Sequence, residues 1–377
     1  MTAVTKASPY DAIADLPLEI EEYDVEFRKR ACAGDFARMR TVLGLQAVEP
    51  DKPGYTRPCT RFSNHGDGAT GVGEDVTYEI EDHQALDDSP IDLPPTGSYT
   101  VDSFSEALDG IDLFPGVDPG REASRSYRRW GIESAALDLA LKQADTDLAT
   151  VLDREYDPVR FLVSTRLGEP PTLERVEQWL EFTPETEFKL DATSAWTPEI
   201  IDELVATDSV RIVDLKGHYK NTDVDQSADV MLYRRIIEAF PDALVEDPRL
   251  TDDTLPLFEG HEHRITWDAP VTDVASIEAL PFTPEWLNVK PSRFGSIENL
   301  FETIEYCLDQ GIGMYGGGQT ELSVGRQHLH ALASLFYPAA PNDTAPCAYN
   351  DPDPVSGLPN SPLSPPSNPR GLEWIPN

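Results

Sequence analysis

Positive charge is scarce in this sequence. Its 377 residues carry 30 Lys and Arg against 68 Asp and Glu, which gives a formal net charge of −38 at pH 7, and only eight residues are lysine. A field this negative repels phosphate backbones and anionic lipids, so nucleic acid and membrane surfaces are poor partners. An acidic, lysine-poor composition is also typical of proteins from salt-loving organisms, in which salt screens the repulsion. Each lysine that remains therefore needs an explanation.

Paired cysteines and long apolar runs are missing as well. The four cysteines are far apart in the sequence and include no CxxC pair, so we expect small buried side chains in a reducing compartment. No apolar run reaches about 18 residues and no signal peptide pattern opens the chain, which predicts a cytoplasmic protein. Hydrophobic residues make up 40% of the chain, enough for the cores of two domains.

The first part of the chain has mixed strand and helix patterns. Residues 18–28 alternate apolar and polar residues with the period of a half-buried strand. Weaker strand patterns follow in segments 37–48, 56–64 and 71–80. Residues 82–120 have the acidic, proline-containing composition of a loop, and residues 121–153 show helical spacing of apolar residues. We therefore predict an α+β domain over residues 18–150.

From about residue 158, short β-rich runs alternate with amphipathic helical stretches, which predicts βαβ units and a parallel sheet. The predicted strands cover residues 159–167, 186–192, 210–218, 242–248, 263–270, 285–291 and 311–317. A doubly wound open sheet is the alternative to a closed barrel, but the loop after the first strand has no GxGxxG. We predict a barrel over residues 151–339. The proline-rich segment 340–377 is expected to pack on the N-terminal domain through Tyr349, Leu363, Trp374 and Ile375.

Charged residues stand where these predicted strands end, which is the face of a barrel that carries active sites. They are Lys189, Asp191, Asp214, Lys216, Glu246, Asp268 and Lys290. Strand alternation predicts that Lys189 and Asp191 share one face, as do Asp214 and Lys216. A carboxylate after an apolar run is costly unless it is paired or holds a metal, and three carboxylates on successive strands suit Mg²⁺. The alternative is that each acidic residue is a helix cap or turn residue.

Short motifs in a fixed order resemble the enolase superfamily, in particular its muconate lactonizing enzyme and o-succinylbenzoate synthase branch. VEDP, TWDAP and LNVKPSRFGSIENL resemble the motifs of the fourth, fifth and sixth strands, and GVGEDVTY resembles a turn of the N-terminal domain. GGGQTELSVGR (316–326) resembles the glycine-rich segment after the seventh strand. The resemblance covers about residues 18–340. It implies a modified TIM-type (β/α)7β barrel with an N-terminal α+β capping domain.

The resemblance also implies a reaction on a small-molecule carboxylate substrate. Mg²⁺ held by Asp214, Glu246 and Asp268 would stabilise an enediolate, and Lys290 would be the acid/base that removes the proton next to the substrate carboxylate. Lys189 matches a helper lysine of the family. The substrate-binding residues implied by the glycine-rich segment are Gly317, Gly318, Gln319 and Glu321. We also expect a homo-oligomer.

Two residues depart from the family pattern. Asp191 stands where a second lysine base is usual, and Lys216 stands where an asparagine is usual. An aspartate is a poor base near pH 7, which argues against two-base racemisation. An ammonium beside Asp214 would weaken metal binding or stand in for the cation. The leading hypothesis is therefore a lyase (dehydratase) or isomerase that uses one base. The alternative is a protein without metal-dependent catalysis that binds an anionic ligand or is structural.

Overall fold

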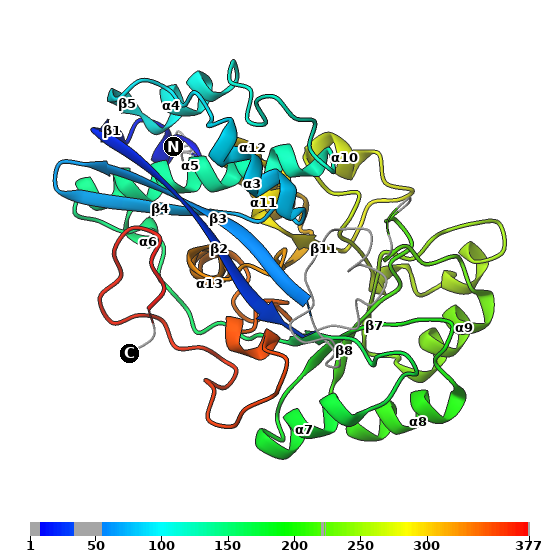
Figure 1. Ribbon diagram of the computed structural model, residues 1–377. Helices are drawn as coiled ribbons and strands as arrows, with labels where there is room; N and C mark the ends of the chain where they lie inside the picture. Colours follow the sequence, from blue (N-terminus) through cyan, green and yellow to red (C-terminus); the bar gives the residue numbers. More distant parts are fainter. Residues whose placement is uncertain (1–7, 34–54, 220–221, 223, 376–377) are drawn as a thin grey trace, which may run out of the picture.

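The computed structural model describes residues 8–33, 55–219, 222 and 224–375. A smaller N-terminal part built around a long antiparallel sheet lies against a larger part in which short strands alternate with helices (Figure 1). The predicted strand at 37–48 falls outside the described residues. None of the helices in the described part is long and apolar enough to cross a membrane.

The N-terminal part contains a three-stranded antiparallel sheet of order β2-β3-β4 and a two-stranded sheet of β1 and β5. Its elements are α1 (Asp11–Ala14), β1 (Pro17–Ile20), β2 (Glu22–Cys32), β3 (Tyr55–Gly66), β4 (Ala69–Asp75), α3 (Ile80–Asp88), β5 (Gly97–Thr100), α4 (Val101–Leu108), α5 (Ala123–Gln143) and α6 (Leu148–Val151). The strand pattern at 18–28 therefore forms two strands rather than one. The prediction of a loop over 82–120 was wrong in part, because that segment contains most of α3 and all of β5 and α4.

Two glycines of β4 allow the sheet to approach helix α5 unusually closely. A Cβ atom on Gly73 would lie 1.9 Å from the carbonyl oxygen of Gly131, and one on Gly71 would lie 2.2 Å from that of Ala135. Backbone atoms cannot yield to such a contact as a flexible side chain can. The glycines of the GVGE motif thus serve the packing of β4 on α5.

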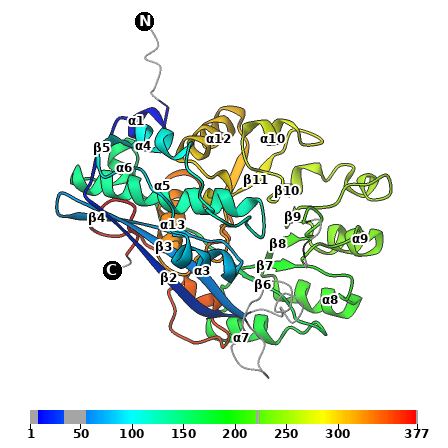
Figure 2. The same cartoon turned by 45° about the horizontal axis from the view of Figure 1, so that its top comes forward.

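The second part is a curled parallel sheet of order β6-β7-β8-β9-β10-β11-β12, with helices on its outside (Figure 2). Its strands are β6 (Val163–Thr165), β7 (Phe188–Asp191), β8 (Val210–Asp214), β9 (Leu244–Glu246), β10 (Ile265–Trp267), β11 (Trp286–Val289) and β12 (Gly313–Gly316). Its helices are α7 (Glu174–Phe182), α8 (Pro198–Thr207), α9 (Val230–Ala239), α10 (Val274–Glu278), α11 (Pro291–Phe294), α12 (Ile297–Gln310) and α13 (Val324–Phe336), with short 3-10 turns at Leu255–Phe258, Glu262–Arg264 and Cys347–Asn350. All seven predicted strand positions are confirmed, and so is the barrel fold class.

Residues just after α13 close the barrel between its first and last strands. Asn342 forms a parallel bridge with Phe161, and its side-chain oxygen accepts a hydrogen bond of 2.6 Å from the Gly316 N–H. The Asp343 N–H donates to the Gly316 carbonyl at 2.8 Å. Asn342 and Asp343 therefore close the (β/α)7β barrel in the place of an eighth strand. They lie just beyond residue 339, which the sequence predicted as the end of this domain.

The rest of the C-terminal segment contacts both parts of the molecule. Arg30 of β2 pairs with Asp351 at 2.7 Å, and the Leu372 N–H donates to Asp138 of α5 at 2.8 Å. Trp374 is buried, but its ring lies 6.1 Å from that of His330 in α13, so this residue packs on the barrel part rather than on the N-terminal part as expected. Ile375 is 59% exposed, so its prediction as an apolar anchor was wrong.

Two buried histidines in α13 make the fold sensitive to acid. Burial lowers the pKa of both His328 and His330 from 6.5 to about 3. Between these values the unfolded chain binds more protons than the folded chain, so the free energy of unfolding falls as the pH is lowered below 6.5. We expect His328→Leu to make this pH dependence shallower, as measured by urea unfolding between about pH 7 and pH 5. The same substitution at the exposed His263 is the control, and equal slopes in the two variants would contradict the prediction.

Candidate active site

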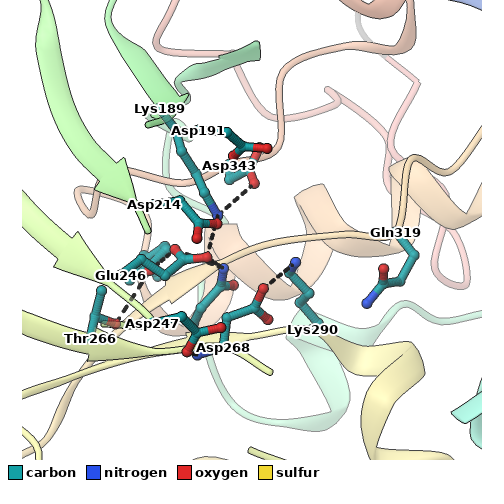
Figure 3. Close-up of polar contacts among 12 residues, drawn as sticks. Lys189, Asp191, Asp214, Glu246, Asp247, Thr266, Asp268, Lys290, Gln319 and Asp343 are labelled. Carbon is teal, nitrogen blue, oxygen red and sulfur yellow. Dashed lines mark hydrogen bonds and ion pairs between the residues drawn. The ribbon is translucent and has the colours of Figure 1, made fainter. Parts of the chain in front are cut away.

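Three carboxylates lie side by side where successive barrel strands end. Asp214 is the last residue of β8, Glu246 is the last residue of β9, and Asp268 directly follows β10. Parallel pairing aligns Asp214 with Glu246. All three side chains are fully buried, and one oxygen of each lies within 4.8 Å of the others. The sequence prediction that these residues come together is confirmed (Figure 3).

Each carboxylate has a lysine partner. The Lys189 ammonium donates to Glu246 Oε1 at 2.5 Å. Lys216 Nζ donates to Asp214 Oδ2 in a short hydrogen bond, and Lys290 Nζ donates to Asp268 Oδ2 at 2.7 Å. Three of the eight lysines of the chain therefore balance the charge of three buried carboxylates. This accounts for their presence in a lysine-poor sequence.

Lys189 and Lys216 are held in the ammonium form by their neighbours. Burial alone would lower the pKa of Lys189, but Glu246, Asp343 and Asp214 together raise it well above its ordinary value. Burial likewise opposes the charge of Lys216, and Asp191 and Asp214 override it, so its pKa is raised too. The neighbouring carboxylates therefore favour the charged form of both side chains. Among the described residues, Lys290 forms one ion pair, with Asp268.

Lys216 contacts Asp214 because the backbone turns after β8, not because the two side chains alternate along one strand. Strand β8 ends at Asp214, and Lys216 has a φ of 48°, in the left-handed region. The backbone thus turns back on itself, so that the Lys216 N–H donates to Asp214 Oδ1 at 2.9 Å while the ammonium contacts Oδ2. The predicted proximity of the two residues is confirmed, but its cause is a turn.

Asp191, at the end of β7, lies beside this pair. Its Oδ1 is 3.5 Å from Lys216 Nζ, and its Oδ2 accepts a hydrogen bond of 2.7 Å from Arg166 Nε. Both oxygens of Asp191 therefore face cationic side chains.

Several residues that sequence reasoning missed hold the carboxylates in place. The Tyr315 hydroxyl donates to Glu246 Oε2, and Asn288 Nδ2 donates to the same oxygen at 3.3 Å. The Tyr219 hydroxyl donates to Asp268 Oδ2 at 2.6 Å, and Arg293 lies 3.2 Å from Asp268 Oδ1. Of these four residues, Arg293 had the clearest sequence signal, because it lies in the KPSRFGS part of the motif quoted above.

Asp247 and Asp343 also belong to this cluster and were not predicted. The Asp247 carboxylate accepts the N–H groups of Asp268 and Ala269, both at 2.9 Å, and so fixes the backbone that presents Asp268. Burial, followed by the nearby Asp268 and Asp214, raises the pKa of Asp247 to about 7. Asp343 belongs to the segment that closes the barrel, and its Oδ2 lies 3.3 Å from Lys189 Nζ.

A cavity of about 1280 Å³ opens above the cluster, between the strand ends and the N-terminal part. Lys189, Lys216 and Lys290 line its floor, whereas the three carboxylates lie beneath them and do not line it. Tyr78 and Arg121 line the cavity from the N-terminal part. The lining contains eight Lys and Arg residues against six Asp and Glu residues, a small excess of positive charge that favours an anion.

The glycine-rich segment after β12 lies in part at this cavity. Gly318 and Gln319 line it. Gln319 Oε1 accepts a hydrogen bond of 2.9 Å from Tyr78, and Gln319 Nε2 is buried and has no hydrogen-bond partner in the described part of the chain, so it could donate to a ligand. Glu321 accepts the Gln319 N–H at 2.7 Å and does not line the cavity.

The packing of a neighbouring side chain explains why residue 317 is a glycine. A Cβ atom there would lie 2.2 Å from the Asn288 side-chain oxygen, so the glycine makes room for Asn288. Contact of Gly317, Gly318, Gln319 and Glu321 with a substrate remains a prediction.

The cluster has the donor set that a divalent cation requires. Carboxylate oxygens are the ligands that Mg²⁺ and Ca²⁺ prefer, and three converge here from three strands. Asp268 Oδ1 is buried and accepts no hydrogen bond from the described residues, although the Arg293 guanidinium lies 3.2 Å away. Asp214, Glu246 and Asp268 therefore fit a metal, but the three ammonium groups compete for the same oxygens.

Two family models match most of the chain. Residues 47–151 match the N-terminal domain, and residues 155–351 the C-terminal domain, of a family described as a domain of unknown function, DUF8230. No curated protein matches the sequence significantly.

Solved structures of the enolase superfamily share the architecture over most of the chain. Muconate lactonizing enzyme from Pseudomonas putida is 19% identical with a TM-score of 0.63, covering 95% of this chain and 97% of that one. The enzyme from Pseudomonas fluorescens, complexed with muconolactone, is 16% identical with a TM-score of 0.64, covering 96% and 97%. An enolase superfamily member from Listeria innocua is 16% identical with a TM-score of 0.62, covering 87% and 86%. At these identities the likeness establishes the fold, as the sequence motifs predicted.

Proposed function

The chain belongs to the DUF8230 family, and we propose that it is an enzyme that removes a proton next to the carboxylate of a small organic acid. The observation that carries this proposal is the buried group Asp214, Glu246 and Asp268, with Lys290 on the next strand beside the same cavity. The fold alone supports many reactions, so the argument rests on these residues.

The charge on the cavity floor suits a carboxylate substrate. Lys189 and Lys216 present fixed positive charge to the cavity, and Gln319 Nε2 offers a further donor. A substrate carboxylate bound there would lose water and gain charge-assisted hydrogen bonds. Asp214, Glu246 and Asp268 would hold Mg²⁺, which when bound supplies Lewis-acid polarisation of that carboxylate.

Lys290 is the residue placed to move the proton. Among the described residues, its ammonium on the cavity floor has one carboxylate partner, Asp268, whereas Lys189 and Lys216 are each held by two or more. In the neutral form, Lys290 Nζ would accept the proton from the carbon next to the substrate carboxylate. The same ammonium would then protonate a leaving group on the same side of the substrate. This favours a one-base lyase or isomerase reaction, such as syn elimination of water.

A second candidate follows from the balance of lysines and carboxylates. The charges of the three carboxylates are balanced without a metal, because each carboxylate already pairs with a lysine: Glu246 with Lys189, Asp214 with Lys216 and Asp268 with Lys290. The protein would then bind an anionic ligand with no metal-dependent chemistry.

Exchange of the α-proton in D₂O separates the two candidates. We expect the protein, incubated with a panel of carboxylic acids that includes muconolactone and with Mg²⁺ or Mn²⁺, to exchange the α-proton of at least one acid, measured by NMR. The exchange should stop on addition of EDTA and in the variant Asp268→Asn. Exchange that is absent across the panel, while an acid still binds in calorimetry, would favour the second candidate.

A further inference from the structure

Lys216 occupies the space around Asp214 that a metal ion would need. Asp214 Oδ2 accepts the Lys216 ammonium, and Asp214 Oδ1 accepts the Lys216 N–H at 2.9 Å. Lys189 Nζ lies a further 3.4 Å from Oδ2. Both oxygens of this carboxylate are therefore engaged by cationic or N–H groups. A divalent cation and the Lys216 ammonium cannot both lie against Asp214 Oδ2 without strong repulsion.

A second acceptor for the same ammonium lies nearby. Asp191 Oδ1 is 3.5 Å from Lys216 Nζ, and the other Asp191 oxygen is held by Arg166 at 2.7 Å. The Arg166 contact fixes the carboxylate so that Oδ1 faces Lys216 (Figure 3 shows Asp191 beside Lys189 and Asp343). Asp191 is not one of the three carboxylates that converge on a metal position. It is therefore an acceptor that a metal would leave free.

From this geometry we propose that Lys216 is an exchangeable internal cation, which neutralises Asp214 while the site is empty and transfers to Asp191 when a divalent cation binds. The proposal rests on the metal site of the proposed function. An ammonium displaced from Asp214 without a new partner would be a costly unpaired charge, because the Lys216 side chain is only 12% exposed. Asp191 removes that cost, so Lys216 and Asp191 together set the affinity of the site for metal.

The inference predicts a coupling between two residues that are not metal ligands. Lys216→Met should bind Mn²⁺ and Mg²⁺ at least about tenfold more tightly than the wild type, because no ammonium has to be displaced. Asp191→Asn should weaken binding about tenfold in the wild-type background, because the displaced ammonium has no acceptor. In the Lys216→Met background, Asp191→Asn should change the affinity little.

The experiment is calorimetric titration of the full chain with MnCl₂ and MgCl₂. The variants are Lys216→Met, Asp191→Asn and the double variant, with Lys29→Met as the control that removes a charge at an exposed site of β2. Thermal melting of each variant confirms that it folds. Anomalous scattering from crystals of the wild type soaked in MnCl₂ gives an independent result, in which Lys216 Nζ should lie against Asp191.

Three results of the titration would each contradict a different part of the proposal. If Asp191→Asn weakens binding equally in both backgrounds, Asp191 acts through its own field and the proposed transfer is wrong. If the wild type binds Mn²⁺ and Lys216→Met binds it no more tightly, the role of Lys216 is wrong while the metal site stands. If neither protein binds Mn²⁺ at millimolar concentration, the metal site of the proposed function fails, and the transfer fails with it.

Discussion

Replacement of Lys290 by alanine should lower the rate of α-proton exchange by about 10²- to 10⁴-fold, the usual contribution of a positioned general base. Lys290 lines the cavity floor and its ammonium pairs with Asp268 at 2.7 Å, at the end of the strand next to β10. Removing the amine removes the group that accepts the proton. The measurement is NMR of the substrate α-proton in D₂O, on whichever acid the wild type exchanges.

Lys290→Arg distinguishes a base from a charge. An arginine keeps the positive charge beside Asp268 but cannot be deprotonated in a protein, so it cannot accept the proton. We expect Lys290→Arg to retain folding and lose exchange, as Lys290→Ala does. Exchange that survives in Lys290→Arg would show that this position supplies only charge, and the base would have to be sought elsewhere. Lys29→Ala, at the exposed site in β2, should leave exchange unchanged.

The position of the site could be predicted from the sequence because the topology of a barrel is restrictive. Parallel strands joined by right-handed crossovers all end on one face, so charged residues after successive apolar runs must meet there. Asp214, Glu246 and Asp268 each follow such a run, and each is buried at a strand end. The position of Glu246 at the end of its strand could be predicted although β9 is only three residues long.

The partners of those carboxylates could not be predicted by the same argument. Tyr219 follows β8 in a loop, and Asp343 follows α13 in the proline-rich segment that was expected to pack on the N-terminal domain. Their contacts with Asp268 and Lys189 depend on loop conformation, for which strand and helix periodicity gives no signal. The left-handed turn at Lys216 is a further case, because a lysine is not a residue from which a positive φ is expected.

Glu74→Ala should lower the free energy of unfolding by about 3 kcal/mol, because it leaves one buried and two half-buried N–H donors without their acceptor. Glu74 belongs to the GVGE motif of β4 and is fully buried. Its Oε1 accepts the Leu322 N–H at 2.6 Å, and its Oε2 accepts the N–H groups of Ser323 and Gly325 at 3.0 and 2.9 Å. A carboxylate of the N-terminal part thus caps the first turn of α13 in the barrel, where its charge also complements the helix dipole.

The sequence identified this motif by resemblance, and the structure supplies its physical role. Glu74 ties β4 to the segment that carries Gln319, so its loss should loosen the cavity wall as well as the fold. The measurement is urea unfolding of Glu74→Ala and Glu74→Gln, with Glu22→Ala at an exposed site of β2 as the control. Glu74→Gln should also destabilise, because its NH₂ group would face N–H donors in place of one carboxylate oxygen. Stability of Glu74→Ala within about 0.5 kcal/mol of the wild type, the range of ordinary surface substitutions, would show that water or a rearranged helix terminus satisfies the donors instead.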